Sequence, residues 1–254
     1  MNLIFVKLGG SLITDKAKPF TEKKDVIKRL AEEIHRARQK KDIKLIIGHG
    51  GGSYPHKPAS DYQVQKGVIN KDSYKGIAEV QDAASRLNRI IVRALLDAGE
   101  LAVSVQPSSS CITEQGRIKE FYTEPIKKFL DYNMIPIPYG DVALDTKMGC
   151  CIISTEEVLN FLTKEFRPER IVLCGKVDGV LDAQNKVIPE ITEKNFAKIK
   201  PMLLASDGID ITGGMLHKVE RMLELKIPSY IINGTREGNL EKALLGEKIG
   251  TEIK

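Results

Sequence analysis

The sequence contains no tryptophan, and only 6% of its residues are aromatic. Its basic residues are not interleaved with aromatic ones, as they are on many nucleic-acid-binding surfaces, so the net charge of +5 favours an anionic small-molecule substrate instead. No apolar run reaches the length of about 18 residues that a membrane-spanning helix needs, and no basic segment precedes the short apolar run at the amino terminus. We therefore expect neither a nucleic-acid nor a membrane partner.

The sequence also lacks the cysteine spacing of a metal site. No two of its four cysteines are separated by two residues, and an adjacent pair does not suit one tetrahedral metal ion. Buried free thiols in a reducing compartment are the simpler interpretation. This interpretation, which predicts a cytoplasmic protein, applies to Cys111, Cys150, Cys151 and Cys174.

No internal repeat, low-complexity tract or flexible linker divides the 254 residues. A chain of this length can bury a sizeable core without disulfides or metals, either as one large domain or as two lobes. Charged residues make up 29% and hydrophobic residues 42%, which is ordinary for a globular protein. We expect two lobes that share one continuous sheet.

Short apolar runs alternate along the chain with segments whose apolar residues recur every three or four positions. The first pattern predicts buried strands and the second predicts helices, so the fold class is α/β with a parallel sheet covered on both faces. Strands are expected at 3–8, 43–47, 101–105, 134–138, 170–174 and 228–232. Helices are expected from Thr21, over 77–95, from Thr123, over 154–166, from Asp210 and over 239–245. The segments 12–19, 56–70 and 182–201 are expected to be mostly irregular.

Glycine-rich turns lie at the carboxyl ends of expected strands or at the start of a helix: the pair at 9–10, the run at 50–52 and the pair at 213–214. Such a turn lets backbone N–H groups approach an anion, because no Cβ stands in the way. None of these segments matches the P-loop or the dinucleotide-binding fingerprint. A tight turn that binds no ligand is the alternative interpretation for each one taken alone.

A lysine lies near each of these turns, namely Lys7, Lys16 and Lys218. Positive charge at these places is what the transfer of a phosphoryl group requires. A single lysine is more often a solvated surface residue, but the three together indicate one anion-binding cleft, because the carboxyl ends of parallel strands share one edge of a sheet.

Five segments together resemble the amino acid kinase superfamily, and they cover essentially the whole chain: Lys7-Leu8-Gly9-Gly10-Ser11, the glycine run at 48–53, Tyr139-Gly140-Asp141, Val177-Asp178-Gly179-Val180, and 210–215. Within it, the histidine after the glycine run and the segment Gln106-Pro107-Ser108 resemble the isopentenyl phosphate kinase family. The resemblance implies an open αβα sandwich with a mainly parallel central sheet, a homodimer, and transfer of the γ-phosphoryl group of ATP, with Mg²⁺, to a small phosphate monoester.

The resemblance also implies roles for individual residues and for the two lobes. Residues 1–145 would form the lobe for acceptor binding and dimerisation, and residues 146–254 the nucleotide lobe of one continuous domain. The implied catalytic residues are Lys7, Lys16, His56, Asp145 and Lys218, with Asp141 as the alternative to Asp145. The implied substrate-binding residues are Gly51, Gly52, His56 and Gly140. The implied nucleotide-binding residues are Lys7, Gly9, Gly10, Ser11, Gly175, Asp178, Gly179, Gly213, Gly214 and Lys218. No protein side chain is predicted to bind a metal.

The chemistry of the acceptor agrees with these roles. A phosphate monoester has a second pKa of about 6, so at neutral pH it is already a dianionic nucleophile and needs no general base. Lysines, Mg²⁺ and backbone amides would screen the two polyanions, and a protonated His56 would bind the acceptor oxygens. Two alternatives stay open: a kinase of another small phosphate or carboxylate, and a nucleotide-binding regulatory protein with weak catalysis.

The sequence departs from the family pattern at three places. Tyr54-Pro55 precedes the histidine where the family usually has Phe-Gly, and Thr155-Glu156 replaces a Gly-Asp pair. Gly175-Lys176 replaces a Thr-Asp pair and so exchanges an acid for a base beside the expected nucleotide site. These departures bear on the shape of the glycine turn and on the choice of nucleotide.

Overall fold

The computed structural model describes residues 2–206 and 214–254. Its strands are β1 (Leu3–Leu8), β2 (Lys44–His49), β3 (Ala102–Val105), β4 (Cys111–Glu114), β5 (Arg117–Phe121), β6 (Ile135–Pro138), β7 (Asp141–Asp145), β8 (Gly149–Ile153), β9 (Arg170–Gly175), β10 (Glu190–Ile191), β11 (Ser229–Asn233) and β12 (Thr251–Ile253). Its α-helices are α1 (Gly10–Ile13), α2 (Lys24–Lys40), α3 (His56–Asp61), α4 (Asp72–Asp97), α5 (Glu124–Asp131), α6 (Thr155–Phe166), α7 (Glu193–Ser206), α8 (Gly214–Leu225) and α9 (Asn239–Leu245). Two short 3₁₀ helices are η1 (Val64–Lys66) and η2 (Pro107–Ser109).

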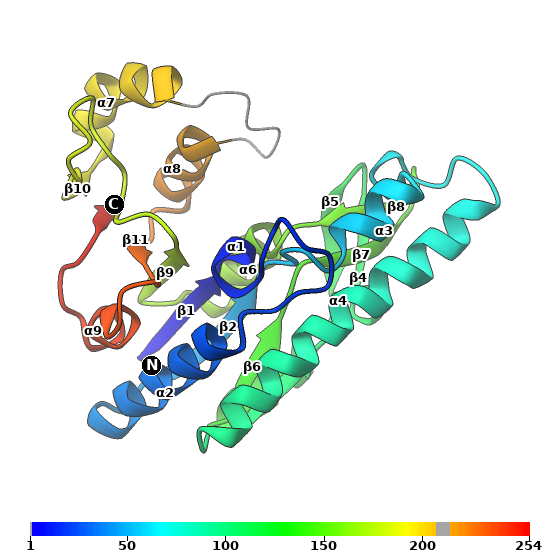
Figure 1. The fold of residues 1–254 in the computed structure, drawn as a ribbon, viewed down its shortest axis with the longest axis horizontal. Helices are drawn as coiled ribbons and strands as arrows, with labels where there is room; N and C mark the ends of the chain where they lie inside the picture. The colour runs from blue at the N-terminus through cyan, green and yellow to red at the C-terminus, as the bar shows by residue number, and fades with distance from the viewer. Residues whose placement is uncertain (1, 207–213) are drawn as a thin grey trace.

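A mainly parallel sheet runs through the middle of the molecule in the order β10-β12-β11-β9-β1-β2 (Figure 1). Only the β11–β12 pair in it is antiparallel. A parallel bridge between His49 and Tyr139 joins the end of β2 to the end of β6, which pairs with β3. These pairings extend the central sheet into the first half of the chain and confirm the predicted α/β fold class.

Helices cover both faces of this sheet, because successive side chains of a strand point to opposite sides. Leu3 and Phe5 pack into a core with apolar residues of α5, α6, α7 and α8. Ile4, Val6 and Leu8 pack into a second core with residues of α2, α4 and α9. The strand is therefore apolar at every position except Lys7, and the fold is the expected αβα sandwich.

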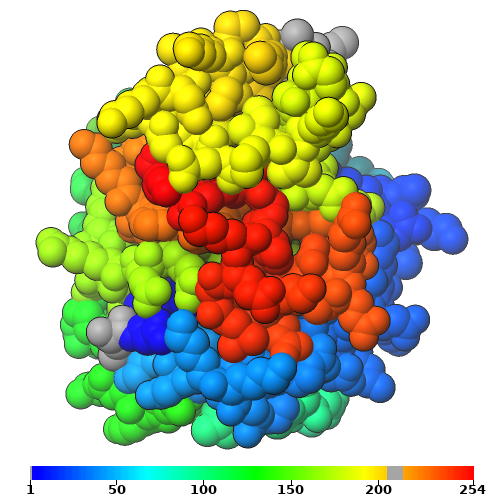
Figure 2. All heavy atoms as spheres, turned by 90° about the vertical axis from the view of Figure 1, so that its left-hand side faces the viewer, coloured from blue at the N-terminus to red at the C-terminus, as the bar shows by residue number. Residues whose placement is uncertain are grey.

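A smaller sheet of four strands, in the order β5-β4-β7-β8, lies beside one end of α4 (Figure 1). Its β7–β8 hairpin spans the expected boundary between the lobes at 145/146, so this boundary marks a turn within a hairpin. At the opposite end of the molecule, the last third of the chain forms the surface shown in yellow, orange and red in Figure 2, above the blue first segment. None of the helices in the described ranges is both long and apolar enough to cross a bilayer.

Several elements differ from the expectations. The helix expected at Thr21 begins instead at Lys24, because the Thr21 hydroxyl donates to Pro19 O and its N–H donates to the Ser53 hydroxyl. The segment 12–19 begins in α1, and 182–201 contains β10 and the start of α7. By contrast, the strand at Leu3–Leu8 and the helix at Asn239–Leu245 are as predicted, and Ser154 caps α6 by accepting the Glu157 N–H at 3.1 Å.

Candidate active site

The carboxyl ends of four parallel strands meet at one edge of the central sheet. Leu8 of β1 lies in register with His49 of β2 and Cys174 of β9, and Gly175 lies in register with Asn233 of β11. The turns that follow these strands are therefore neighbours, as expected for a ligand site in an open parallel sheet.

The first two glycine turns pack directly against each other, and we call residues 9–11 and 50–52 together the glycine cradle. A Cβ placed on Gly10 would lie 2.5 Å from Gly52 N, and one on Gly50 would lie 2.8 Å from Gly10 N. Gly52 also has a φ of +56°, which side chains disfavour. The close approach of the two turns thus explains these glycines without a ligand, and a further observation is needed to connect them with an anion.

Several backbone N–H groups of the glycine cradle have no partner among the residues that the structure describes. In the described part of the chain, the N–H groups of Gly10, Ser11, Gly51 and Gly52 donate no hydrogen bond. Gly9 N, by contrast, donates to Cys174 O, and Gly50 N donates to Leu8 O. Neighbouring free N–H groups in facing turns are a preformed arrangement for binding phosphate oxygens.

Thr14, which is fully buried, holds the two halves of the cradle together. Its hydroxyl donates to Gly10 O at 2.8 Å and accepts the Ser53 N–H at 3.0 Å. Its Cγ2 methyl group and hydroxyl occupy the space where a Cβ of Gly52 would lie. Sequence patterns did not single out this residue, because one threonine after a glycine pair carries no recognisable signal.

Lys7 points into the edge of the sheet from the end of β1 and contacts Glu156 in the first turn of α6. The Lys7 ammonium lies 2.6 Å from a Glu156 carboxylate oxygen. Burial alone would raise the pKa of Glu156, but the charge and hydrogen bond of Lys7, together with the charge of Lys218 on α8, lower it. Glu156 is therefore an ionised acid that interacts with two of the predicted catalytic lysines, although in the sequence it stands out only as a departure from the family pattern.

Thr155, the other half of that departure, fits between two glycines. Its hydroxyl donates to His49 O at 2.5 Å, at the end of β2. A Cβ on Gly48 would lie 2.5 Å from the Thr155 methyl group, and one on Gly140 would lie 3.2 Å from its hydroxyl. The structure thus places Gly140, a predicted substrate-binding residue, against the start of α6 and next to the cradle.

Lys16 and His56 line an open hollow beside the cradle. Its volume is about 280 Å³, and it is lined by Lys16, Pro19, Gly52, Ser53, His56 and Lys57. Although His56 is exposed at the surface, the protein atoms around its ring lower its pKa by partial burial, and the charge of Lys16 lowers it further. In the free protein His56 is thus mostly neutral at pH 7, and the expectation of a protonated ring applies only once an anion has bound.

Tyr54 and Pro55 shape the cradle beside this hollow. The buried Tyr54 donates its hydroxyl to Glu22 at 2.5 Å and packs edge-on against Phe20 at 5.6 Å between ring centroids. A Cβ on Gly51 would lie 2.3 Å from the Pro55 ring. This departure from the family pattern therefore anchors the loop that carries Lys16 and makes glycine necessary at position 51.

The predicted nucleotide side lies at the turns after β9 and β11. A Cβ on Gly175 would meet no atom within 4 Å, so that edge is open. Asp178 accepts hydrogen bonds from Asn233 at 3.0 Å and Arg236 at 2.7 Å, and these bonds lower its pKa. Gly179 is packed against Thr251 of β12. Asp178 thus joins the two turns, with its carboxylate engaged by protein groups.

Lys23 and Lys176 bring two further cations to this side. The Lys23 ammonium donates to Ser11 O at 3.3 Å. Burial lowers the pKa of Lys23, and the neighbouring ammonium of Lys176 lowers it further. Lys176, noted in the sequence as a base in place of an acid, therefore faces another lysine beside the cradle.

One predicted residue, Asp145, stands apart from this group. Asp145 accepts backbone N–H groups of Gly116 at 2.8 Å and of Lys147 at 2.8 Å, which lower its pKa well below the usual range although burial opposes them. These contacts give it a structural role in two turns, and the acid that contacts Lys7 is Glu156. Gly213 lies outside the described residues, whereas Gly214 begins α8.

A larger hollow of about 620 Å³ lies between η2, β4, β5 and α6. Among the residues that the structure describes, none of the predicted site residues lines it, and Glu120 is the one charged residue in its lining. An anion would find no positive charge there, so the candidate site is the smaller hollow with the cradle.

Helices on both faces of a mainly parallel sheet, with glycine turns and lysines at its carboxyl edge, define an open αβα sandwich with a candidate phosphate site. The chain belongs to the amino acid kinase family, whose model matches residues 2–233. It is 40% identical to the isopentenyl phosphate kinase of Methanocaldococcus jannaschii, with 99% of this chain and 98% of that protein covered. The enzyme of the same name from Methanothermobacter thermautotrophicus is 35% identical, with 99% of this chain and 98% of that protein covered.

A solved structure of isopentenyl phosphate kinase is also similar, with a TM-score of 0.80 and 32% sequence identity. The match between the two structures covers 99% of this chain and 100% of the chain of that structure. These similarities confirm the resemblance on which the sequence analysis relied.

Proposed function

We propose that this protein transfers the γ-phosphoryl group of ATP to isopentenyl phosphate and so forms isopentenyl diphosphate. The observation that carries the proposal is the pair of facing glycine turns whose four N–H groups have no acceptor within the described residues, with Lys7 beside them. Two polyanions brought into contact need this concentration of donors and positive charge. The names of the relatives with 35% and 40% identity support the choice of acceptor.

The acceptor phosphate would bind in the hollow formed by Lys16, His56 and Gly52. His56 donates one ring N–H as a neutral imidazole, and it gains a proton as the dianion approaches. Lys16, Lys57 and His56 line this hollow. Their positive charge and hydrogen-bond donors suit a phosphate monoester better than a carboxylate, because the monoester carries about two negative charges and three acceptor oxygens at neutral pH.

ATP would place its phosphates along the cradle, with Lys7, Lys218 and the lysine pair Lys23 and Lys176 neutralising them. Mg²⁺, held mainly by the ATP phosphates, supplies further charge neutralisation when bound. Glu156 keeps Lys7 in place next to the cradle. The acceptor is already a dianion, so the protein only aligns the two phosphates and stabilises the charge that develops between them.

The proposal extends to the two lobes, the oligomeric state and the cellular location. Residues 1–145 would hold the acceptor and residues 146–254 the nucleotide, with Gly175, Asp178 and Gly179 at the nucleotide side. The family resemblance supports a homodimer, which sedimentation of the purified protein tests directly. A cytoplasmic location fits the four cysteines, each of which is buried and free.

Turnover of an acceptor panel tests the proposal. The protein with ATP, Mg²⁺ and isopentenyl phosphate should release ADP and form the diphosphate product, and Lys218→Ala should reduce this rate. Turnover of UMP or of a carboxylate acceptor, without turnover of isopentenyl phosphate, would assign a different kinase activity. ATP binding without turnover of any acceptor would instead favour a nucleotide-binding regulatory protein.

A further inference from the structure

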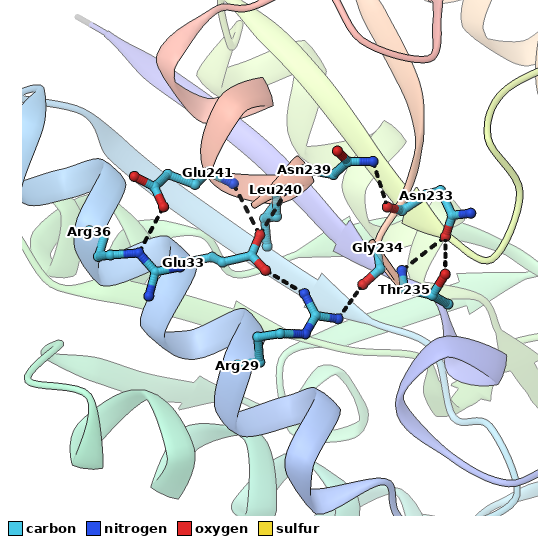
Figure 3. A network of polar contacts seen from close by, with 9 residues as sticks. All are labelled: Arg29, Glu33, Arg36, Asn233, Gly234, Thr235, Asn239, Leu240 and Glu241. Carbon is cyan, nitrogen blue, oxygen red and sulfur yellow. Dashed lines mark hydrogen bonds and ion pairs between the residues drawn. The ribbon is translucent and has the colours of Figure 1, made fainter. Parts of the chain in front are cut away.

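A cluster of charged side chains on α2 reaches across to the turn that follows β11 (Figure 3). Arg29 and Glu33 lie one helical turn apart on α2 and form an ion pair, and the Glu33 carboxylate is completely buried. A buried carboxylate is costly unless its oxygens are paired, so the partners of Glu33 matter for the local structure.

Glu33 serves as the amino-terminal cap of another helix. Helix α9 has Gly238 at its N-cap and no side-chain cap of its own. Glu33 accepts the N–H groups of Leu240 at 2.9 Å and Glu241 at 3.3 Å, which are two of the donors that the start of a helix leaves unpaired. Glu33 thereby fixes the start of α9 against α2.

Arg29 extends this connection to the turn at 233–235. Its guanidinium donates to Gly234 O at 2.5 Å, and Asn239 of α9 donates its side-chain amide to Asn233 O at 3.0 Å (Figure 3). Two successive carbonyl groups of the turn are thus held from α2 and α9. Gly234 is also enclosed, because a Cβ there would lie 2.3 Å from Cys174 Sγ and 2.6 Å from Leu12.

The same helix contacts the glycine cradle. Lys23, the residue that precedes α2, donates to Ser11 O, and Arg29, nearly two helical turns further along, bonds to Gly234 O. On the other side of the turn, Gly234 N donates to Gly175 O at 2.8 Å, and the Asn233 side chain donates to Asp178. One helix thus spans the cradle and the turn that carries Asn233.

We propose that Arg29 and Glu33 are positioning residues that set the affinity for ATP by fixing the turn at 233–235 relative to the glycine cradle. This inference rests on the proposed function, in which the strand-end turns of β9 and β11 hold the nucleotide. Neither side chain touches the reacting groups. Arg29 acts through Gly234 O, and Glu33 acts through Arg29 and the start of α9, so they control nucleotide binding and leave acceptor binding unchanged.

The test compares Arg29→Met with the matched control Arg36→Met in the full-length protein. Arg36 is on the same helix and pairs with Glu241 of α9 at 2.8 Å, and it has no bond to the turn. Asn239→Ala is the second variant, since it releases the turn without leaving a buried charge unpaired. The dissociation constant of ATP is measured by calorimetry, KM for each substrate by steady-state kinetics, and Tm by thermal unfolding.

We expect Arg29→Met to raise the dissociation constant of ATP on the order of tenfold, and Asn239→Ala to raise it several-fold. KM for isopentenyl phosphate should stay unchanged in both variants, and Arg36→Met should bind ATP as the wild type does. The inference is overturned if folded Asn239→Ala and Arg29→Met bind ATP normally, or if Arg36→Met weakens binding equally. The proposed function is tested separately, by the turnover of the acceptor panel by the wild-type protein. The two tests are independent, because calorimetry measures the ATP affinities of the variants without any turnover.

Discussion

The ammonium group of Lys7 lies 2.6 Å from the carboxylate of Glu156, a residue 149 positions further along the chain. This contact joins the end of β1 to the first turn of α6 and places an ionised pair at the edge of the cradle. Lys7 is only 14% exposed, so its charge is screened less by water than that of a surface lysine. Glu156 therefore fixes the position of the Lys7 ammonium where the proposed reaction develops negative charge.

Replacing Lys7 with alanine should lower kcat on the order of 100-fold, which is a typical effect of removing one charge-stabilising donor from an active site. The matched control is Lys44→Ala. Lys44 begins β2 at the opposite edge of the same sheet, and its replacement should leave kcat unchanged. Steady-state kinetics check both variants, and equal kcat values for them would remove Lys7 from the reaction.

Lys218→Ala should mainly lower kcat, because a charge near the transferred group matters most as the transition state forms. Arg221 lies one turn further along α8 and pairs with Glu157 at 3.0 Å. Arg221→Ala removes a cation from the same helix and should have little effect on kcat. If Lys218→Ala changed only the KM for ATP, Lys218 would be a binding residue without a role in the transfer.

Binding of the acceptor should take up protons at pH 7. The pKa of His56 is lowered in the free protein, and a bound phosphate dianion raises it, so the ring gains a proton on binding. Calorimetry in buffers of different ionisation enthalpy measures this uptake, which should be a fraction of a proton. His56→Gln should abolish it and weaken acceptor binding far more than ATP binding. Equal uptake by His56→Gln would assign the proton to another group.

Asp141 should make the protein less stable as the pH rises. It is 2% exposed, and burial raises its pKa from 3.8 to about 6, although hydrogen bonds from Ser108 and Val142 oppose this shift. Between these two pH values the folded protein keeps a proton that the unfolded chain has released. The free energy of unfolding therefore falls by about 2 to 3 kcal/mol across this window.

Asp141→Asn does not titrate and removes this effect. Relative to the wild type, the variant should gain about 2 to 3 kcal/mol of stability between pH 4 and pH 7, measured by urea unfolding at both pH values. A constant difference between the two proteins would show that Asp141 ionises normally in the folded state.

Thr14→Val should loosen the cradle, because it removes the hydroxyl that bonds to Gly10 O and Ser53 N and keeps the side-chain volume. Leaving these buried groups unpaired should cost about 1 to 3 kcal/mol of stability and weaken ATP binding. Thr14→Ser keeps the hydroxyl and is the control. Chemical unfolding and calorimetric ATP binding check both variants. Normal ATP binding by Thr14→Val would show that the contacts of the Thr14 hydroxyl do not contribute to the nucleotide site.

The elements predicted well from the sequence are those with strong local signals. The strand at Leu3–Leu8 is apolar at almost every position because helices cover both of its faces, and Ser154 is a strong capping residue before α6. The short strands β4, β8 and β12 were missed because their stability comes from pairing with distant segments. Thr21 was misassigned as a cap because Ser53, a residue 32 positions away, holds its backbone.

In the candidate site too, the residues with a local sequence signal were predicted, and those that depend on distant contacts were missed. Glycine turns and neighbouring lysines were visible in the sequence because consecutive glycines and a nearby lysine form a short local pattern. The acid that contacts Lys7 was not, since an expected Gly-Asp pair is Thr155-Glu156 in this chain and only the fold brings Glu156 to Lys7. Lys23 and Thr14 were missed for a similar reason: each acts on a turn through one contact that no short motif encodes.

The packing of Thr155 against Gly48 makes these two positions epistatic. Alanine at position 48 is excluded while the Thr155 methyl group lies 2.5 Å from where its Cβ would be. Serine at position 155 would remove that methyl group and keep the hydroxyl that bonds to His49 O. The order of substitution therefore matters in evolution: a lineage can change position 155 first and position 48 afterwards, whereas the reverse order passes through a destabilised intermediate.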